Sequence, residues 1–482
     1  MNGETRPGLV ANDGLLAALG PARRHVTRQL VDVFVEAGEE LYLVGGIVRD
    51  ALMSRPLPND LDFATSALPE RTLQLGRSAG AVGSYLVGER FGTVGLVFAI
   101  GDDEVNVEIT TYRHEHYPNP TRFPTVELGG QLHDDLGRRD FTVNAIAIDP
   151  GQGGIIDPFD GQADSARAII RAVGNPDLRF TEDPLRLLRA ARFVSQLGFR
   201  IEPETAAAMR RNGSSLERIS QERIFAELTK LLIGPYVEHA LQSLAETGLL
   251  TIAMPLLEPL VAEAGMTARH RAHREKDLWP HTLHVVRQSP ARPVVRWAAL
   301  LHDAAKPATR RLDANGEVSF IGHEQAGARL AGRLLRQLKA DKSTIQAVER
   351  LVELHGRPAT YDTEWSDSAV RRLALDAGDG WDDLLDLAAA DVTSGREHRR
   401  QLAGRRIQLL RAHFDRLQAE SDLAELQSPL DGTELMALFG RGPGAWIKPV
   451  KDRLRDLVID GKITPGDKVA AERIARELVS GT

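Results

Sequence analysis

Two aspartates separated by a single residue are the first feature of this sequence that could do chemistry. Asp60 and Asp62 flank Leu61 in a short alternating segment that predicts a β-strand, and on a strand residues i and i+2 point to the same face. Two neighbouring carboxylates repel each other unless a cation neutralises them, and Mg²⁺ prefers carboxylate oxygens. The pair indicates a Mg²⁺ site, although a solvated strand edge is the commoner explanation of two such aspartates taken alone.

A pair of glycines upstream suggests what the cation would accompany. Gly45 and Gly46 follow a short apolar run, 41–44, and precede a helical pattern over 47–53. Glycine lets the backbone approach a bound group closely, and the free N–H groups at a helix start attract phosphate. Arg49, in the first turn of that helix, could hold a triphosphate. The glycines, the arginine and the aspartates together describe a phosphate-binding turn beside a metal site.

The elements around these residues predict an α+β domain. Residues 24–38 have the pattern of an amphipathic helix, and the candidate strands are 41–44, 60–66, 82–87, 93–100 and 104–111. Glu108 lies on the last strand and could be a third catalytic carboxylate, or simply an exposed strand residue. Residues 114–131 are rich in Pro, Gly and polar residues and predict a mobile loop.

Helical spacing of apolar residues begins after about residue 163 and continues to the C-terminus. On the first of these helices, 182–198, Asp183 and Arg186 are three apart and would share a face. Arginine only donates hydrogen bonds and an ionised aspartate only accepts them. Cytosine and adenine present an acceptor ring nitrogen beside an amino donor, whereas guanine and uracil present the reverse order. The pair therefore suits C and A, unless it is an ordinary surface ion pair. Arg189 and Arg192 follow on the helix and could reach phosphates or stay solvated.

Four motifs in a fixed order resemble the class II bacterial tRNA nucleotidyltransferase and poly(A) polymerase family, within the superfamily of polymerase β type. They are LVGGIVRDAL with DLDFAT, then RRDFTVNAIA at 138–147, DPFDG at 157–161 and EDPLRLLRAARF at 182–193. The resemblance covers roughly residues 24–250. It implies a polymerase-β-like head whose strands carry the catalytic carboxylates and a helical neck that carries the base-selecting residues.

The resemblance also implies an activity and a set of site residues. The activity is template-independent addition of CCA to tRNA 3′ ends from CTP and ATP, with Asp60 and Asp62 holding two Mg²⁺ ions. Glu108 stays the candidate for a third catalytic carboxylate because of its place on the later strand. The Arg and Asp of the second motif contact the sugar, and the Asp–Arg pair of the fourth selects the base. The nucleotide-binding residues so implied are Gly45, Gly46, Arg49, Arg139, Asp140, Asn144, Asp183, Arg186, Arg189 and Arg192.

Three other classes of function stay open at this point: a close relative that adds a different tail, a nucleotide phosphohydrolase and, least favoured, a non-catalytic RNA-binding module. A poly(A) polymerase, or an enzyme that adds only CC or only A, would share the same catalytic core. A nucleotide phosphohydrolase with a non-catalytic RNA-binding head fits less well, because the aspartates and their glycine partners are intact.

A second group of potential metal ligands lies in the C-terminal half. His302 and Asp303 begin an HDxxK motif that ends at Lys306. Further candidates occur in order around it: His281, His323, His355 and Asp391. Imidazole and carboxylate suit divalent transition metals. The set resembles the HD phosphohydrolase superfamily, with Ala305 where Gly is common and His284 as an alternative to His281.

The second resemblance implies a metal-dependent phosphatase or phosphodiesterase that acts on nucleotides or RNA ends, with Mn, Ni, Fe or Mg as the metal. The alternative is an inherited helical domain that only helps to grip tRNA. A basic run at 396–414 could also contact tRNA, or it could be a solvated helix face.

The composition limits the remaining choices. The 482 residues are 42% hydrophobic and 26% charged, as expected of a globular protein with several domains. There is no cysteine, which excludes disulfides and thiolate metal sites. The net charge of −7 argues against a general nucleic-acid binder but leaves room for a local basic groove. We expect no signal peptide and no membrane span, and hence a cytoplasmic protein, either monomer or homodimer.

These observations predict five segments along the chain. They are an N-terminal helical extension (1–35), the nucleotidyltransferase head (36–165), a helical neck and RNA-binding domain (166–265), the HD domain (270–395) and a helical C-terminal tail (396–482).

Overall fold

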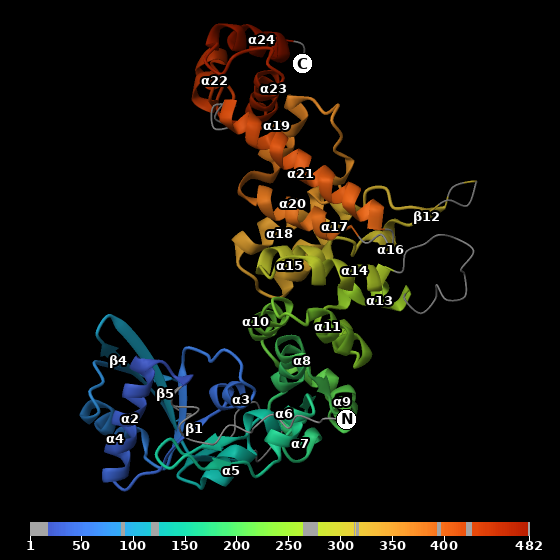
Figure 1. Ribbon diagram of the computed structural model, residues 1–482. Helices are drawn as coiled ribbons and strands as arrows, with labels where there is room; N and C mark the ends of the chain where they lie inside the picture. Colours follow the sequence, from blue (N-terminus) through green and yellow to red (C-terminus); the bar gives the residue numbers. More distant parts are fainter. Residues whose placement is uncertain are drawn as a thin grey trace. The chain divides into compact units, whose positions relative to one another are not determined.

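The computed structural model describes residues 18–87, 92–116, 125–263, 278–312, 314, 318–392, 397–420 and 427–480. The chain divides into two compact units, Met1–Glu258 and Pro259–Thr482, coloured blue to green and green to red in Figure 1. The predicted fold class, an α+β head followed by all-α segments, is confirmed. The finer division into five segments stays a prediction.

The head is built on a seven-stranded sheet with the strand order β3-β4-β5-β2-β1-β8-β9. The strands are β1 (Leu41–Val44), β2 (Leu61–Thr65), β3 (Gly83–Val87), β4 (Thr93–Ile100), β5 (Asp103–Thr111), β8 (Ala147–Ile148) and β9 (Ile155–Ile156). Strands β2 and β5 run parallel, and the other neighbouring pairs in this sheet run antiparallel. All five predicted strands are therefore present to within two residues at each end.

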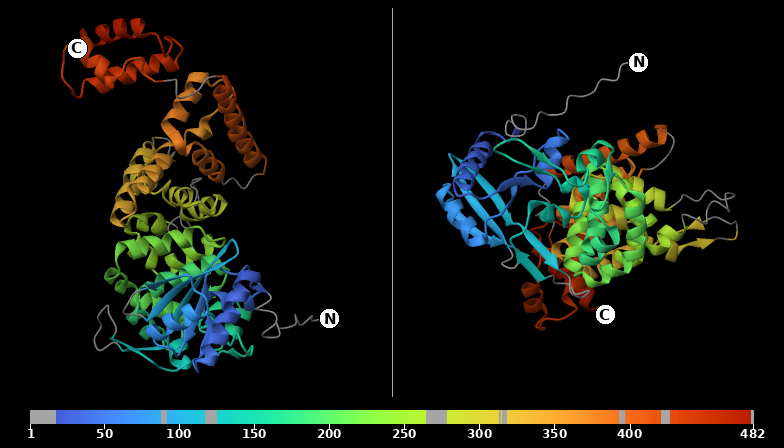
Figure 2. Two further views of the ribbon diagram at one scale, coloured as in Figure 1. Left: turned by 90° about the vertical axis from the view of Figure 1, so that its left-hand side faces the viewer. Right: turned by 90° about the horizontal axis from the view of Figure 1, so that it is seen from below.

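One face of the sheet carries the head core. Helices α2 (Pro21–Glu36) and α4 (Pro69–Ser78) cover this face, as Figure 1 and Figure 2 show. Side chains of both helices pack there with alternate residues of the strands, among them Leu61 and Phe63 of β2. Because successive side chains on a strand point to opposite faces, Asp62 between them projects from the other face. The apolar alternation of β2 thus decides where its aspartate points.

The predicted loop at 114–131 is partly wrong. Strands β6 (Arg113–His116) and β7 (Thr125–Leu128) form an antiparallel pair, and residues 117–124 lie outside the described part of the chain. The two strands satisfy each other's backbone N–H and C=O groups, which a structureless segment would leave to water. The three prolines of the window all fall between the two strands in sequence, so counting prolines over the whole window hid the strands on either side of them.

The rest of unit 1 is mainly helical. It contains α3 (Gly46–Leu52), α5 (Leu132–Gly137), α6 (Gly161–Ala166), α7 (Pro176–Glu182), α8 (Leu185–Leu197), α9 (Pro203–Asn212), α10 (Gln221–Leu232), α11 (Val237–Glu246) and α12 (Leu249–Ala253), and α13 (Glu258–Glu263) follows at the boundary. Helix α8 is buried along most of its length and packs against α10 and α11. Its position between the head and these helices makes it the central element of the neck.

The predicted helix 182–198 is interrupted near its start. Helix α7 ends at Glu182, Asp183 has an extended backbone (φ −136°, ψ 97°), and α8 begins at Leu185 after Pro184. A residue that precedes proline is sterically disfavoured in the helical region, which accounts for the break. Asp183 therefore does not share a helix face with Arg186, and the geometric basis of that prediction was wrong.

Unit 2 is a stack of helices. They are α14 (Leu278–Gln288), α15 (Pro293–Leu301), α16 (Lys306–Thr309), α17 (His323–Gln337), α18 (Lys342–Leu354), α19 (Asp367–Ala377), α20 (Trp381–Ala390), α21 (Glu397–Glu420), α22 (Gly432–Phe439), α23 (Ile447–Ile459) and α24 (Lys468–Ser480). A short hairpin, β12 (Arg311–Leu312) with β13 (Val318–Ser319), precedes α17. Helices α22 to α24 share a small apolar core. Among the described residues, no helix is both long and apolar enough to cross a membrane.

Some arginines of the basic run on α21 (Glu397–Glu420) bind other residues of unit 2. Arg411 of the run pairs with Asp382 of α20, and Arg416, just beyond the run on α21, donates to Asp367 of α19 at 2.7 Å. Arg406 donates to the carbonyl of Ala359 at 2.7 Å. These arginines hold α21 against its neighbours, so the run is not simply a solvated face. Contact with tRNA stays a prediction for the remainder of the run.

Candidate active site and candidate metal centre

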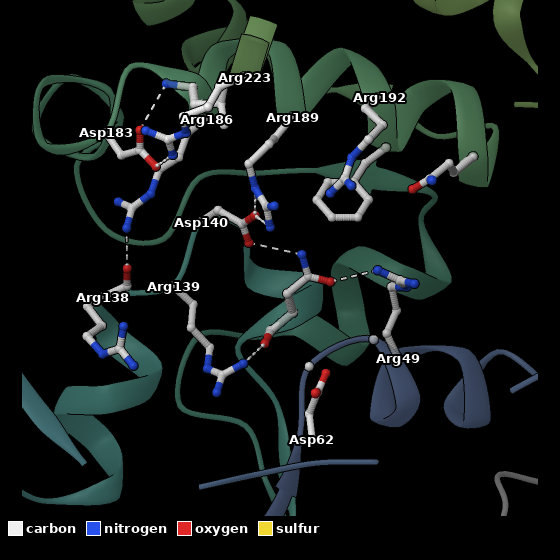
Figure 3. Close-up of a pocket in the computed structure, with 16 residues that line it drawn as sticks. Arg49, Asp62, Arg138, Arg139, Asp140, Asp183, Arg186, Arg189, Arg192 and Arg223 are labelled. Carbon is white, nitrogen blue, oxygen red and sulfur yellow. Dashed lines mark hydrogen bonds and ion pairs between the residues drawn. The ribbon is translucent and has the colours of Figure 1, made fainter. Parts of the chain in front are cut away.

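A cavity of about 540 Å³ lies between the head and the neck of unit 1 (Figure 3). Its walls come from α3, β2, the 138–144 segment, α8 and α10. All ten residues predicted to bind the nucleotide line it, and so does Asp62. Asp60 and Glu108 are not among its lining residues in the part of the chain that the structure describes. Sequence reasoning missed five lining residues: Arg138, Leu185, Phe193, Gln196 and Arg223.

The three predicted carboxylates form one electrostatic group although only Asp62 faces the cavity. Glu108 of β5 is the register partner of Asp62 on β2, and Asp60 lies exposed just before that strand. Burial, together with the charges of Glu108 and Asp60, raises the pKa of Asp62 to about 6 against the opposing effect of Arg139. Like charges close together favour protonation of one of them. A bound cation would relieve the same repulsion.

The glycine turn approaches this carboxylate directly. Gly45 has φ +77°, a backbone conformation that favours glycine. A Cβ at this position would lie 3.6 Å from Oδ2 of Asp62 and 3.5 Å from Nη1 of Arg139. The turn continues directly into α3, so the free N–H groups at the N-terminus of α3 lie next to Asp62.

A chain of hydrogen bonds connects α3 to α8 across the cavity wall. Arg49 donates from Nη1 to Oδ1 of Asn144 at 2.8 Å, and Asn144 donates from Nδ2 to Oδ1 of Asp140 at 2.9 Å. Oδ2 of Asp140 accepts from Nε and Nη2 of Arg189, at 2.8 and 2.5 Å. Burial alone would raise the pKa of Asp140, but Arg189 and Asn144 lower it to about 2. The network keeps Asp140 ionised and links the second and fourth motifs.

The predicted base-selecting residues do not contact each other through their side chains. Asp183 accepts from the N–H of Leu185 at 3.1 Å, and its Oδ2 lies 3.5 Å from Nη2 of Arg223 on α10. Arg186 instead donates to Glu182 at 3.0 Å. It is further held by two backbone carbonyls, those of Arg138 at 2.7 Å and Arg179 at 3.3 Å. Asp183 is thus held by Arg223 and Arg186 by Glu182, while both side chains still line the cavity (Figure 3).

The cavity is strongly basic inside an acidic chain. Seven arginines and three aspartates line it. Several of these arginines are anchored on carboxylates that are not lining residues: Asp50 holds Arg49, Glu182 holds Arg186, and Asp135 holds both Arg138 and Arg139. Charge-assisted anchors fix a guanidinium while leaving its other N–H groups available. The wall is therefore pre-organised to receive several phosphate charges.

Unit 2 contains a compact cluster of the predicted HD residues. His281, His302 and Asp391 form one triad of potential ligands, and Asp303, His323 and His355 form a second. Nε2 of His302 lies 3.1 Å from Oδ2 of Asp303, and Nε2 of His281 lies 3.0 Å from Oδ1 of Asp391. The half-buried His284 pairs with Arg287 instead. The fold therefore brings His281, and not His284, into the cluster.

Three imidazoles of the cluster are oriented in the same way. Nδ1 of His302 lies 2.8 Å from the carbonyl of Ala299, and His323 and His355 make matching contacts to Phe320 and Val352 at 2.8 and 2.7 Å. A carbonyl only accepts, so each Nδ1 carries the proton and each Nε2 presents its lone pair to the cluster. This is the arrangement found around metal ligands.

Two further observations fit a cation at this cluster. Oδ1 of Asp303 is buried and has no hydrogen-bond partner among the described residues, which is costly for a carboxylate oxygen unless something else occupies it. Burial, together with the neighbouring His302, lowers the pKa of His355 to about 4, so this imidazole is neutral near pH 7 and available as a ligand. The donor set suits a divalent metal.

Comparison with known families identifies three regions of the chain. Residues 41–171 match the Poly A polymerase head domain, residues 198–260 the probable RNA and SrmB-binding site of polymerase A, and residues 282–431 the HD domain. Both resemblances drawn from the sequence motifs are confirmed.

Individual relatives extend the likeness over nearly the whole chain. The CCA-adding enzyme of Geobacillus sp. (strain WCH70) is 31% identical over 454 residues, which span 94% of this chain and 97% of the relative. That of Geobacillus thermodenitrificans is 42% identical over 266 residues, which span 55% of this chain and 59% of the relative. The crystal structure of the Bacillus stearothermophilus CCA-adding enzyme in complex with CTP superposes with a TM-score of 0.67 at 28% identity, covering 98% of this chain and 100% of that one. The chain therefore belongs to the family of CCA-adding enzymes.

Proposed function

We propose that this protein adds CCA to the 3′ ends of tRNA, with CTP and ATP as nucleotide donors. The observation that carries the proposal is the cavity of unit 1, which combines Asp62, the Gly45–Gly46 turn and seven arginines in one wall. Family membership supports it, since the relatives with which the chain aligns are CCA-adding enzymes.

The carboxylates and arginines would divide the work of nucleotidyl transfer. Asp60, Asp62 and Glu108 would hold Mg²⁺, and the crowding that raises the pKa of Asp62 fits such a role. When bound, Mg²⁺ would activate the RNA 3′-hydroxyl and neutralise the departing pyrophosphate. The glycine turn would place backbone N–H groups on the triphosphate, while the anchored arginines would match its charge. Catalysis in this site is mainly positioning and charge neutralisation.

The ribose would be bound by Arg139, Asp140 and Asn144. The base would be bound by Asp183 and Arg186. Because Arg186 is held from behind by Glu182 and two carbonyls, its remaining N–H groups can donate to the acceptor ring nitrogen of C or A. Asp183 can accept from the neighbouring amino group. Guanine and uracil would leave both partners unsatisfied, and buried unpaired groups are what gives a hydrogen-bonding site its selectivity.

Asp183→Asn should therefore lower the preference for CTP over UTP, on the order of 10²-fold. An asparagine amide can donate to the uracil carbonyl, which an ionised aspartate cannot. The measurement is the ratio of kcat/KM for CTP and UTP on a tRNA transcript that lacks its last three nucleotides. Asp177→Asn is a suitable control, since Asp177 on α7 pairs with Arg211 at the surface. An unchanged ratio in Asp183→Asn would show that Asp183 does not read the base.

The activity itself is tested by offering labelled nucleoside triphosphates singly and together to that transcript with Mg²⁺. Two additions from CTP alone, and a third only when ATP is present, are the expected result. Long A-tails would indicate a poly(A) polymerase, and one A added only to a CC-ending transcript would indicate an A-adding enzyme. No incorporation, with phosphate released instead, would overturn the proposal.

We also propose a metal-dependent phosphohydrolase activity for the HD cluster, on nucleotides or RNA ends. The unpartnered Oδ1 of Asp303 and the common orientation of the imidazoles favour it. Each of the two triads would hold a divalent ion such as Mn, Ni, Fe or Mg. A bound metal would polarise a phosphoryl group and supply a nucleophilic hydroxide near neutral pH.

A further inference from the structure

Three guanidinium groups of the cavity wall surround a single aromatic ring. The guanidinium carbons of Arg192, Arg49 and Arg189 lie 4.6, 5.4 and 5.5 Å from the ring centre of Phe193. Phe193 lines the cavity but is only 5% exposed. It packs in a T-shaped contact against Phe141, with the two ring centres 5.7 Å apart. We call Arg49, Arg189 and Arg192 the arginine platform; Figure 3 shows the three side chains directed toward one region of the cavity.

The platform joins two elements that are far apart in sequence. Arg49 belongs to α3 of the head, whereas Arg189 and Arg192 belong to α8 of the neck. Each arginine has an anchor on its outer side: Asn144 for Arg49, Asp140 for Arg189 and, at 3.1 Å, Glu227 for Arg192. Phe193 lies within cation–π distance of all three guanidinium groups, so it can hold the head and neck arginines facing each other.

The Phe193 ring offsets the charge repulsion among the three arginines, which their hydrogen-bonding and ion-pair partners do not remove. Burial lowers the pKa of Arg192, and the charges of Arg189 and Arg49 lower it further. Among the described residues, Nε of Arg192 has no hydrogen-bond partner, because its approach to Glu227 lacks the geometry of one. The electron-rich face of an aromatic ring attracts cations. Three like charges can therefore stay close together around Phe193 before any anion arrives.

We propose that Phe193 is a positioning residue that holds the arginine platform ready for the triphosphate of the incoming nucleotide. The inference rests on the proposed function of this cavity and gives a role in it to Phe193, the last residue of the fourth motif. Phe193 acts through the arginines and touches no reacting atom. Triphosphate is common to CTP and ATP, whereas base choice belongs to Asp183 and Arg186 at another part of the wall. Weakening the ring should therefore affect both nucleotides equally and leave base selection unchanged.

Stepwise fluorination of the ring tests this with only a small change in its size. Phe193→monofluoro-, difluoro- and trifluorophenylalanine would be introduced into the full chain, since each fluorine withdraws electron density from the ring face and weakens its attraction for cations. The dissociation constant of inorganic pyrophosphate in the presence of Mg²⁺ would be measured, together with kcat/KM for CTP and ATP. The same series at Phe98, in the head core, controls for fluorine in a buried position.

We expect pyrophosphate binding to weaken with each added fluorine, by about tenfold over the whole series. The values of kcat/KM for CTP and ATP should fall by the same factor, with the CTP to UTP ratio unchanged. A flat series at Phe193, or one that matches Phe98, would overturn the proposal. Because pyrophosphate binding is measured without tRNA, the proposal can fail in a protein that adds CCA. The proposal for Phe193 can also hold in a protein that does not add CCA, so failure of this proposal can be told apart from failure of the proposed function.

Discussion

Replacing Asp62 with asparagine is expected to abolish nucleotide addition and, without Mg²⁺, to make the protein more stable. The loss of rate should be at least about 10³-fold, because several kcal/mol of charge stabilisation depend on the metal ligands. The gain in stability follows from the raised pKa of Asp62. Its folded-state value of about 6 exceeds the ordinary value of 3.8, so the ionised side chain disfavours the folded state.

The pH dependence of that gain has a definite sign. A carboxyl whose pKa is raised on folding weakens the protein increasingly as pH rises from about 4, and the loss is complete above about 6. Near neutral pH, Asp62→Asn should therefore raise the free energy of unfolding by about 1–3 kcal/mol, and at pH about 4 the two proteins should be equally stable.

Denaturation in EDTA at several pH values, with single-turnover incorporation of labelled CTP, measures both effects. Asp103→Asn, at the exposed start of β5, removes a carboxylate charge outside the cavity and should change neither property. Incorporation that survived in Asp62→Asn would remove Asp62 from the reaction. A loss of activity without the rise in stability would mean that Glu108 and burial do not act on Asp62 as the structure indicates.

The second large effect is expected at the HD cluster. Asp303→Asn should remove bound divalent metal and phosphohydrolase activity while CCA addition stays within about twofold of the wild type. Both oxygens of Asp303 lie among the histidines, at 3.1 Å from His302 and 3.6 Å from His323, and an amide is a poor ligand in place of a carboxylate. The loss of hydrolysis should be at least about 10³-fold, since the nucleophile depends on the metal.

Metal content of the purified protein and hydrolysis of cyclic and linear nucleotide monophosphates are the two measurements. The two triads predict two ions per chain in the wild type. His284→Ala provides a matched control, because His284 lies on the same helix as His281 but contacts Arg287 outside the cluster. Asp62→Asn should in turn retain full metal content at the HD cluster. Unchanged metal content in Asp303→Asn would contradict the site, and loss of CCA addition in the same variant would contradict the independence of the two activities.

Local patterns determined much of both sites before any tertiary contact was known. The alternation around Asp62 and the glycines before α3 depend on backbone geometry within a few residues, so their spacing alone indicated a carboxylate beside a phosphate-binding turn. The order of the HD residues was equally readable, because His302 directly follows the apolar helix α15 and His355 directly follows α18. The break after Asp183 was also encoded locally, in Pro184, although the helical periodicity of its surroundings obscured it.

Other features were decided only by packing between distant segments. The pairing of Glu108 with Asp62 depends on the register of β2 and β5, and the contact of Arg223 with Asp183 depends on how α10 lies beside α8. The three guanidiniums around Phe193 come from α3 and α8. A side chain's type and its neighbours in sequence determine which hydrogen bonds it can donate or accept and which charges it repels. Its partner is chosen by which elements the core brings together, and that choice rests on the summed burial of many residues rather than on any local pattern.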